Sequence, residues 1–121
     1  MPYADTDFFL ALLKPSDWLR KPAQRLLREH KGNTWTSGWT IVELMLIAKR
    51  FNLDLERVVM SVFELTEVRG INRDAALGAS HLVMSKGMNV FDSLHAMTCG
   101  DDSIISSDKV FDEIGMKRII L

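Results

Sequence analysis

Short apolar runs alternate with longer amphipathic stretches along the whole chain, and the two patterns predict strands and helices in turn. The predicted strands cover residues 2–5, 34–37, 103–106 and 117–121. The predicted helices cover residues 8–13, 17–32, 40–50, 54–65, 74–87, 90–99 and 108–115. Strands that are separated by helices usually form a parallel sheet with helices on both faces. The pattern therefore predicts the α/β class, as a three-layer α/β/α sandwich with a short, mostly parallel central sheet.

Local signals define the ends of the first two helices. Pro15 ends the first helix, Ser16 is the predicted N-cap of the second, and Gly32 ends the second. Trp18 is expected to be among the residues that face the core. Pro22 lies in the first turns of the second helix, so it predicts either a kink or a later start.

The two helices at the middle of the chain differ in their apolar pattern. Residues 40–50 are nearly all apolar until a basic last turn, and Glu43 is the only acid among them. This composition predicts a central helix that is surrounded by protein. The helix over 54–65 instead has one apolar face, which includes Val58 and Phe63.

Composition places the chain among ordinary globular proteins. It has 121 residues, 47% of them hydrophobic and 26% charged, and this length fits one domain over residues 1–121. No apolar run reaches the roughly 18 residues of a membrane span, and the start MPYADTDFF lacks the pattern of a signal peptide. We therefore expect a cytoplasmic protein with no membrane partner.

Charge is distributed unevenly between the two halves of the chain. Residues 1–50 carry eight Lys/Arg and five Asp/Glu, whereas residues 51–121 carry seven and eleven. Most of the basic excess lies in the predicted second helix. Such a stretch is usually a solvated face, but beside an acidic phosphodiester site it could bind RNA phosphates. Arg25 and Arg28 are the candidate substrate-binding residues.

Four carboxylates stand among apolar segments of the sequence: Asp5, Glu43, Asp92 and Asp108. Burying an uncompensated carboxylate costs on the order of several kcal/mol, so a cation is expected beside them. Asp5 and Asp108 each end a predicted strand, and the carboxyl ends of parallel strands share one edge of the sheet. Glu43 and Asp92 lie on helices next to these strands, so all four can converge there. Oxygen ligands, without paired histidines, favour Mg²⁺ or Mn²⁺.

The same segments carry a resemblance to a known family. The segments ADTDFFLALL, TIVELMLIA with its internal glutamate, FDSLHA followed by GDDSIISSDKVFDEIG, and the closing RIIL together resemble a PIN domain over nearly the whole chain. The order and spacing of the acids carry the specificity, since DTD alone would be weak. The resemblance is greatest to small prokaryotic PIN proteins of the VapC type.

This resemblance implies a metal-dependent endoribonuclease that hydrolyses RNA phosphodiester bonds, as the toxin of a toxin–antitoxin pair. The acidic quartet would be catalytic and would bind Mg²⁺ or Mn²⁺. Thr6, Ser106 and Ser107 match the small polar residues that accompany the first and last aspartates of the family. The VapC type also implies a homodimer and a cognate antitoxin that inserts a segment across the acidic groove.

Each acid also has an ordinary interpretation. Asp5 or Asp108 could cap the helix that follows it, and Glu43 could pair with a buried arginine. Asp7 either contacts a metal or only starts the first helix. Asp112 is expected on an exposed helix face and is the substitute if Asp108 proves misplaced.

His81 and His95 are interpreted as helix residues with local hydrogen bonds, because neither has a nucleophile beside it.

Three other functions stay open. A receiver domain needs an acceptor aspartate at the end of a central strand, and only Asp54 comes near that place. A haloacid-dehalogenase-type phosphatase is suggested by DTD, but Phe8-Phe9 follows where Gly-Thr is usual. The third is a catalytically idle PIN scaffold or an RNA-binding module.

Overall fold

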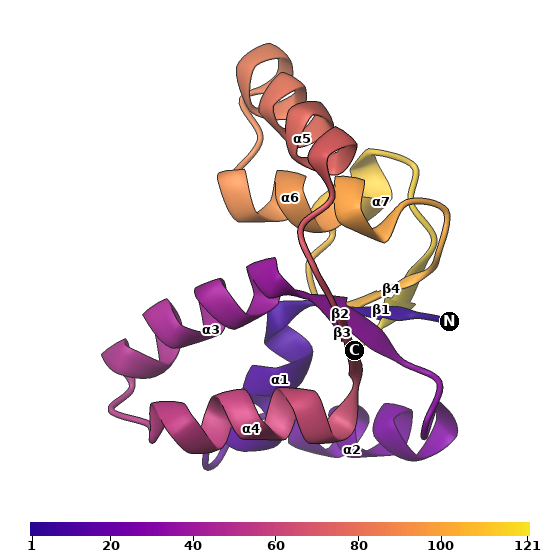
Figure 1. Ribbon diagram of the computed structural model, residues 1–121. Helices are drawn as coiled ribbons and strands as arrows, with labels where there is room; N and C mark the ends of the chain where they lie inside the picture. Colours follow the sequence, from indigo (N-terminus) through magenta and orange to yellow (C-terminus); the bar gives the residue numbers. More distant parts are fainter.

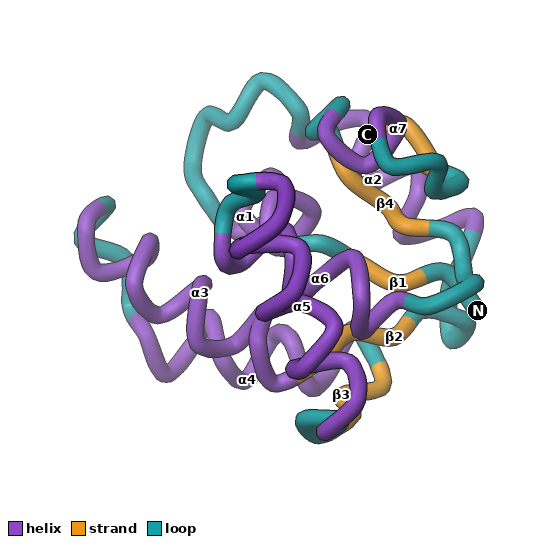
Figure 2. The backbone as a smooth tube through the Cα atoms, turned by 90° about the horizontal axis from the view of Figure 1, so that it is seen from above, coloured by secondary structure: helices purple, strands orange, loops and turns teal.

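A computed structural model describes residues 1–121, and its centre is a five-stranded sheet (Figure 1). The strands are β1 (Tyr3–Ala4), β2 (Trp35–Ser37), β3 (Glu67–Arg69), β4 (Ile104–Ser106) and β5 (Arg118–Ile120). Every neighbouring pair is parallel, in the order β3-β2-β1-β4-β5. Viewed from above, β3, β2, β1 and β4 follow one another in this order (Figure 2).

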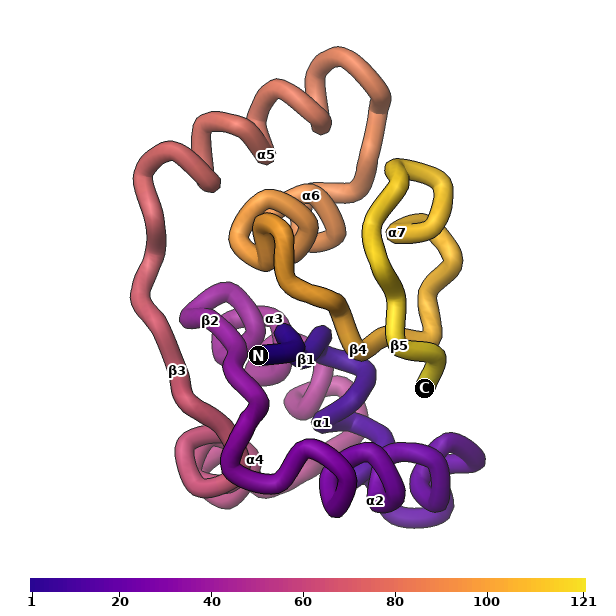
Figure 3. The backbone as a smooth tube through the Cα atoms, turned by 90° about the vertical axis from the view of Figure 1, so that its right-hand side faces the viewer, coloured from indigo at the N-terminus to yellow at the C-terminus, as the bar shows by residue number.

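Helices cover both faces of the sheet. They are α1 (Thr6–Leu13), α2 (Arg20–Glu29), α3 (Gly38–Arg50), α4 (Leu55–Leu65), α5 (Arg73–Lys86), α6 (Val90–Cys99) and α7 (Val110–Glu113). The first four lie on one face and the last three on the other, as Figures 1 and 3 both show. The predicted three-layer α/β/α sandwich is therefore confirmed. None of these helices has both the length and the apolar composition that crossing a membrane requires.

The strand order explains where a site can form. The chain passes from β1 to β2 and β3 on one side of the sheet, and then returns to build β4 and β5 on the other side of β1. The order therefore reverses between β1 and β4. In open parallel sheets the crevice for a ligand lies outside the carboxyl ends of the strands at such a switch point.

Side chains along the strands alternate between the two layers of the core, as the pleat requires. Ala4 and Ile105 belong to the larger core cluster, which the first four helices cover. Tyr3 and Ile104 belong to a second cluster that includes Phe111 of α7. Because both faces of these strands are buried, β1 and β4 form a fixed platform for the residues that follow them.

Strand β3 is absent from the sequence-based prediction. Its residues Glu67 and Arg69 are exposed, and only Val68 packs against the core. It is an edge strand that pairs with β2 alone. A three-residue strand with two charged side chains has no apolar run, so the sequence carried no usable signal for it.

The start of α2 also differs from the prediction. Ser16 has a φ of 63° and caps nothing, while the Leu19 amide donates to Asp17 Oδ1 at 2.8 Å before the helix begins at Arg20. The late start lets Pro22 fall in the first turn, where its missing N–H costs no hydrogen bond. Trp18 consequently lies outside the helix with 84% of its surface exposed, so its predicted inward position is wrong.

Helix α3 is not surrounded by protein. Leu44 and Ala48 are fully buried, whereas Val42 and Leu46 are 47% and 52% exposed. Phe63 of α4 is likewise exposed rather than part of the buried face. Apolar composition alone did not reveal that only one side of α3 has neighbours within the chain.

Candidate metal-dependent active site

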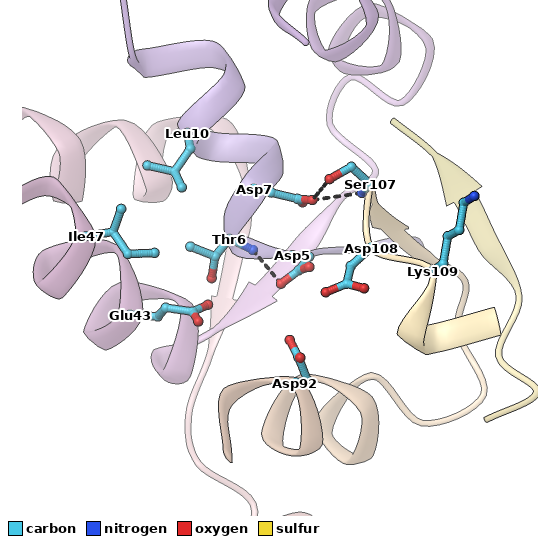
Figure 4. A pocket seen from close by; sticks show the side chains of 10 residues that line it. All are labelled: Asp5, Thr6, Asp7, Leu10, Glu43, Ile47, Asp92, Ser107, Asp108 and Lys109. Atoms are coloured by element: carbon cyan, nitrogen blue, oxygen red, sulfur yellow. Dashed lines mark hydrogen bonds between the residues drawn. The ribbon is translucent and has the colours of Figure 1, made fainter. Parts of the chain in front are cut away.

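An open cavity of about 650 Å³ lies at the carboxyl ends of β1 and β4 (Figure 4). Carboxylates dominate its lining: Asp5, Thr6, Asp7, Leu10, Glu43, Ile47, Asp92, Ser107, Asp108 and Lys109. All four acids of the predicted quartet are among these residues, and Asp7 is a fifth. They come from the β1–α1 junction, α1, α3, α6 and the segment after β4. Folding thus gathers acids that are far apart in the sequence.

Asp5 serves both the helix and the cavity. Its Oδ1 accepts a hydrogen bond from the Thr6 amide at 2.7 Å, which caps α1. Its Oδ2 accepts one from the Ser106 hydroxyl at 2.7 Å, so the end of β4 holds the carboxylate from the other side. The capping interpretation of Asp5 is correct, and the carboxylate nevertheless faces the cavity.

Asp7 is fixed by the segment after β4. Its Oδ2 accepts hydrogen bonds from the Ser107 amide at 2.8 Å and from the Ser107 hydroxyl. Its Oδ1 is buried and has no hydrogen-bond partner. An unpartnered buried carboxylate oxygen calls for an explanation, and a bound ion or water is one. Asp7 therefore does more than begin α1.

Asp92 and Asp108 approach the cavity from opposite sides. The N-cap of α6 is Asn89, whose Oδ1 accepts from the Asp92 amide at 3.3 Å, so the Asp92 carboxylate is not needed as a cap. In Figure 4 that carboxylate points from α6 toward Asp5 and Asp108. Asp108 is exposed at the rim, and its Oδ1 accepts from the Val110 amide at 2.9 Å.

Glu43 reaches the cavity from α3 and contacts a histidine rather than an arginine. Its Oε1 lies 2.9 Å from Nε2 of His95, which is fully buried on α6. The same Nε2 lies 3.4 Å from Asp5 Oδ1. The interpretation of His95 as a helix residue with local hydrogen bonds is therefore wrong, and the alternative in which Glu43 pairs with a buried arginine is not observed.

Burial and mutual repulsion raise the pKa values of the cavity acids. Burial, followed by the charge of Asp5, raises the pKa of Asp7 to about 6. Burial, followed by the charges of Asp108 and Glu43, raises the pKa of Asp92 to about 6. The pKa of Asp5 is also raised, chiefly by burial. These shifts mean that the protein compensates the negative charge of the cavity incompletely.

The cationic groups near the site do not cancel this charge. Lys109 lines the cavity, but in Figure 4 its amine points away from the carboxylates. Burial alone would lower the pKa of His95, but its hydrogen bond with Glu43 and the charge of Asp5 raise it. One atom each of Asp5, Glu43 and His95 lie within 4.8 Å of one another, which is close enough to surround an ion. The donor set, dominated by carboxylate oxygens, fits a hard divalent cation.

Other predicted residues lie elsewhere. Arg25 and Arg28 are exposed on α2 and do not line the cavity, and Arg25 is 3.7 Å from Glu29. Asp54 caps α4 through the Arg57 amide, so no aspartate ends a central strand at midchain as a receiver domain requires.

Two buried residues beside the site were missed by sequence reasoning, His95 and Tyr3. A usable signal existed for both. His95 follows Asp92 by three positions, which places the two side chains on one face of a helix. Tyr3 precedes Asp5 by two positions, which places both on one face of an extended strand. This spacing shows that each residue shares a face with a cavity aspartate, but it does not show which residues of other segments the side chain contacts.

No family model and no curated protein match the sequence. Solved structures do match it over nearly the full length. A chain from a toxin–antitoxin complex of Klebsiella pneumoniae is 19% identical with a TM-score of 0.74, covering 95% of this chain and 93% of that one. VapC20 of Mycobacterium tuberculosis, a Sarcin–Ricin loop cleaving toxin, is 16% identical with a TM-score of 0.80 and 96% coverage of both chains.

A chain of FitAcB from Neisseria gonorrhoeae is 17% identical with a TM-score of 0.75, covering 98% of this chain and 96% of that one. At these identities the likeness establishes a shared fold. The protein has a PIN-like α/β fold, with a five-stranded parallel sheet between helices, and it shares this fold with VapC20 and the chain of FitAcB.

Proposed function

We propose that this protein is a metal-dependent endoribonuclease and the toxin of a toxin–antitoxin pair. The observation that carries this proposal is the cavity at the switch point of the sheet, where five carboxylates meet and no lysine or arginine points inward. The relatives of the same fold support the choice of substrate, since one is described as cleaving the Sarcin–Ricin loop.

The proposed roles follow from how each acid is held. Asp5 and Asp92 would bind Mg²⁺ or Mn²⁺ directly, while Glu43 and Asp108 would orient water or hold a second ion. Asp7 would add a further ligand through its unpartnered Oδ1. A bound divalent cation would supply the positive charge that activates water and stabilises the charge developing on the phosphate.

The small polar residues have supporting roles. The hydroxyls of Ser106 and Ser107 donate to Asp5 and Asp7, so they fix carboxylates and are not poised as nucleophiles. The Thr6 amide holds the second oxygen of Asp5. Because these contacts exist before any ligand arrives, the carboxylates are preorganised, and water serves as the nucleophile.

Exposed apolar residues support partners beyond RNA. Val42 and Leu46 on α3 and Met60 and Phe63 on α4 are each at least 47% exposed. Apolar side chains that gather on a surface mark sites of protein association. We propose that they contribute to a homodimer, and that a cognate antitoxin covers the acidic cavity, as the relatives crystallised in toxin–antitoxin complexes suggest. Light scattering on the purified protein tests the dimer.

The decisive test is cleavage of a structured RNA by the purified protein with and without Mn²⁺, alongside the variant Asp5→Asn. We expect cleavage that requires Mn²⁺ or Mg²⁺, disappears with EDTA and is lost in Asp5→Asn. Cleavage by Asp5→Asn at the wild-type rate would remove the assignment. Absence of cleavage by a correctly folded wild type that still binds RNA would favour an idle scaffold or RNA-binding module.

A further inference from the structure

The imidazole of His95 lies directly behind the carboxylates and is completely buried. Its Nε2 atom is 2.9 Å from Glu43 Oε1, 3.4 Å from Asp5 Oδ1 and 3.2 Å from the Thr6 hydroxyl. Its Nδ1 atom is 2.7 Å from the Tyr3 hydroxyl. The ring therefore joins β1, α3 and α6 at the base of the cavity.

The position of the proton on Nε2 follows from these partners. Carboxylate oxygens only accept hydrogen bonds, so the nitrogen that faces both Glu43 and Asp5 must carry a hydrogen atom. This holds for the neutral ring with its proton on Nε2 and for the doubly protonated ring. A nitrogen that bears a hydrogen atom has no free lone pair for a metal, so His95 does not act as a ligand in this arrangement.

Tyr3 fixes the opposite side of the ring. Its hydroxyl is buried and also lies 2.8 Å from the Ser37 hydroxyl. A phenol keeps its proton at neutral pH, and at 2.7 Å the Tyr3 hydroxyl can donate it to Nδ1. When Nδ1 accepts, the proton of a neutral imidazole must sit on Nε2, which is the tautomer that Glu43 needs.

Glu43 depends on this contact more than the other acids do. Asp5 and Asp7 accept from backbone amides and serine hydroxyls, whereas the hydrogen bond from His95 is the one that holds the Glu43 carboxylate. The Glu43 side chain is 19% exposed, so without His95 it is free to rotate into solvent. The hydrogen bond from His95 therefore determines the position of the Glu43 carboxylate at the cavity.

We propose that His95, oriented by Tyr3, is a positioning residue that holds Glu43 and Asp5 in their metal-binding arrangement without binding the metal itself. This inference rests on the proposed metal-dependent function and extends it to a second layer of residues. Groups that orient ligands in this way typically contribute about 10- to 100-fold to metal affinity or activity.

The test measures Mn²⁺ binding by calorimetry, with no RNA present, for wild type and four variants. Tyr3→Phe removes one hydroxyl, His95→Ala removes the ring, and His95→Gln restores a donor near the position of Nε2. His81→Gln is the matched control, because His81 is exposed on α5 outside the cavity. Circular dichroism and thermal unfolding check that each variant is folded.

We expect His95→Ala to weaken Mn²⁺ binding about 10- to 100-fold, Tyr3→Phe to weaken it less, and His95→Gln to recover part of the loss. His81→Gln should bind as wild type does. If His95→Ala does not fold, Tyr3→Phe and His95→Gln still give the comparison. Wild-type affinity in a folded His95→Ala, or in Tyr3→Phe where His95→Ala does not fold, would overturn the inference.

Two further measurements separate positioning from general structural support. In a double-mutant cycle, His95→Ala should cause a smaller loss in the Glu43→Ala background than in wild type, since part of its effect acts through the Glu43 carboxylate. Pulsed electron paramagnetic resonance of bound Mn²⁺ should show no coupling to a histidine nitrogen. Fully additive losses, or a nitrogen coupling that disappears in His95→Gln, would overturn the inference.

Failure of the inference can be told apart from failure of the proposed function. If wild type and Asp5→Asn bind Mn²⁺ equally weakly, the metal site itself is absent and both proposals fall. If wild type binds Mn²⁺ in the expected manner but cleaves no RNA, the proposed activity falls and the role of His95 stands. If wild type cleaves RNA while the His95 and Tyr3 variants bind Mn²⁺ normally, only the inference falls.

Discussion

Asp92 and Asp112 have opposite surroundings in the folded protein. Asp112 on α7 accepts from Nε and Nη2 of Arg118 at 3.0 and 2.8 Å, and this hydrogen-bonded pair lowers the pKa of Asp112. Asp92 faces other carboxylates across the cavity, and its pKa is raised to about 6. One site satisfies its charge internally, whereas the other leaves it for a cation from outside.

The comparison shows how the fold separates stability from the proposed chemistry. The guanidinium of Arg118 also donates through Nη1 to the Ser106 carbonyl, so it ties β5 and α7 to the end of β4. Asp112 is therefore part of the support for β4 and is not a substitute for Asp108. The cavity acids instead repel one another, and the proposed metal ion would compensate this repulsion.

The largest expected effect is on catalysis. Asp92→Asn and Asp112→Asn each replace a carboxylate with an amide of the same shape. We expect Asp92→Asn to lower Mn²⁺-dependent RNA cleavage by more than about 100-fold, because a direct ligand matters more than a residue that orients one. Asp112→Asn should cleave at nearly the wild-type rate. Equal losses of RNA cleavage in both variants would contradict the different roles given to Asp92 and Asp112.

A second effect is on stability and has the opposite direction. The pKa of Asp92 in the folded protein is raised from 3.8 to about 6, so the folded state binds this proton more tightly than the unfolded state does. Stability from this group is therefore lost as pH rises through about 6. The shift corresponds to roughly 3 kcal/mol, which solvent screening of this partly exposed group reduces to about 1 kcal/mol.

Urea unfolding in EDTA measures this effect. Asp92→Asn should be more stable than wild type at pH 7, and the two proteins should be about equally stable near pH 4, where Asp92 is protonated. Saturating Mn²⁺ should reverse the order at pH 7, because binding to the folded state stabilises it. A variant that is less stable than wild type at pH 7 in EDTA would contradict the proposed repulsion.

A third effect concerns RNA binding by the exposed helix α2. If Arg25 and Arg28 contact phosphates, the double variant Arg25→Ala/Arg28→Ala should reduce the slope of log affinity against log salt by about 1.4, at about 0.7 per contact with single strands. Exposed Arg73 on α5 provides the control, and Arg73→Ala should leave the slope unchanged. RNA affinity is measured by filter binding, and every protein also carries Asp5→Asn so that the RNA is not cleaved. An unchanged slope would mean that Arg25 and Arg28 do not contact RNA phosphates and lie on an ordinary solvated helix face.

The smallest effect is expected for the Asp112 pair itself. Arg118→Met removes the guanidinium while keeping a side chain of similar length, and Asp112 is left exposed to water. We expect a modest decrease in Tm, from the loss of this pair and of the hydrogen bond to the Ser106 carbonyl, and unaltered Mn²⁺ affinity. A large loss of Mn²⁺ affinity would mean that Arg118 acts on the cavity through β4 as well.

The sequence predicted the layers of the fold well and some of its details poorly. Short runs of apolar and β-branched residues identified β1, β2, β4 and β5, because such residues favour strands. The edge strand β3 was missed because Glu67 and Arg69 are solvated. Apolar periodicity also placed Trp18 and Phe63 in the core, although both are exposed.

The convergence of the four acids was predicted correctly, their roles stay a prediction, and the residues that surround them were not predicted. Asp5 and Asp108 could be placed because each follows a strand, and parallel strands end at one edge. Glu43 and Asp92 could be placed only near this edge. Their histidine partner could not be recognised, because His95 contacts residues on β1 and α3 that are distant in sequence.

The sequence by itself determined which residues form strands and helices and which carboxylates follow them, because these depend on local pattern and spacing. Tertiary structure alone decided that Asp7 keeps an unpartnered oxygen, that Glu43 is held from behind by His95, and that Asp112 has its own arginine. The physical reason is that the compensation of a charge depends on distances between segments, which a linear pattern does not contain.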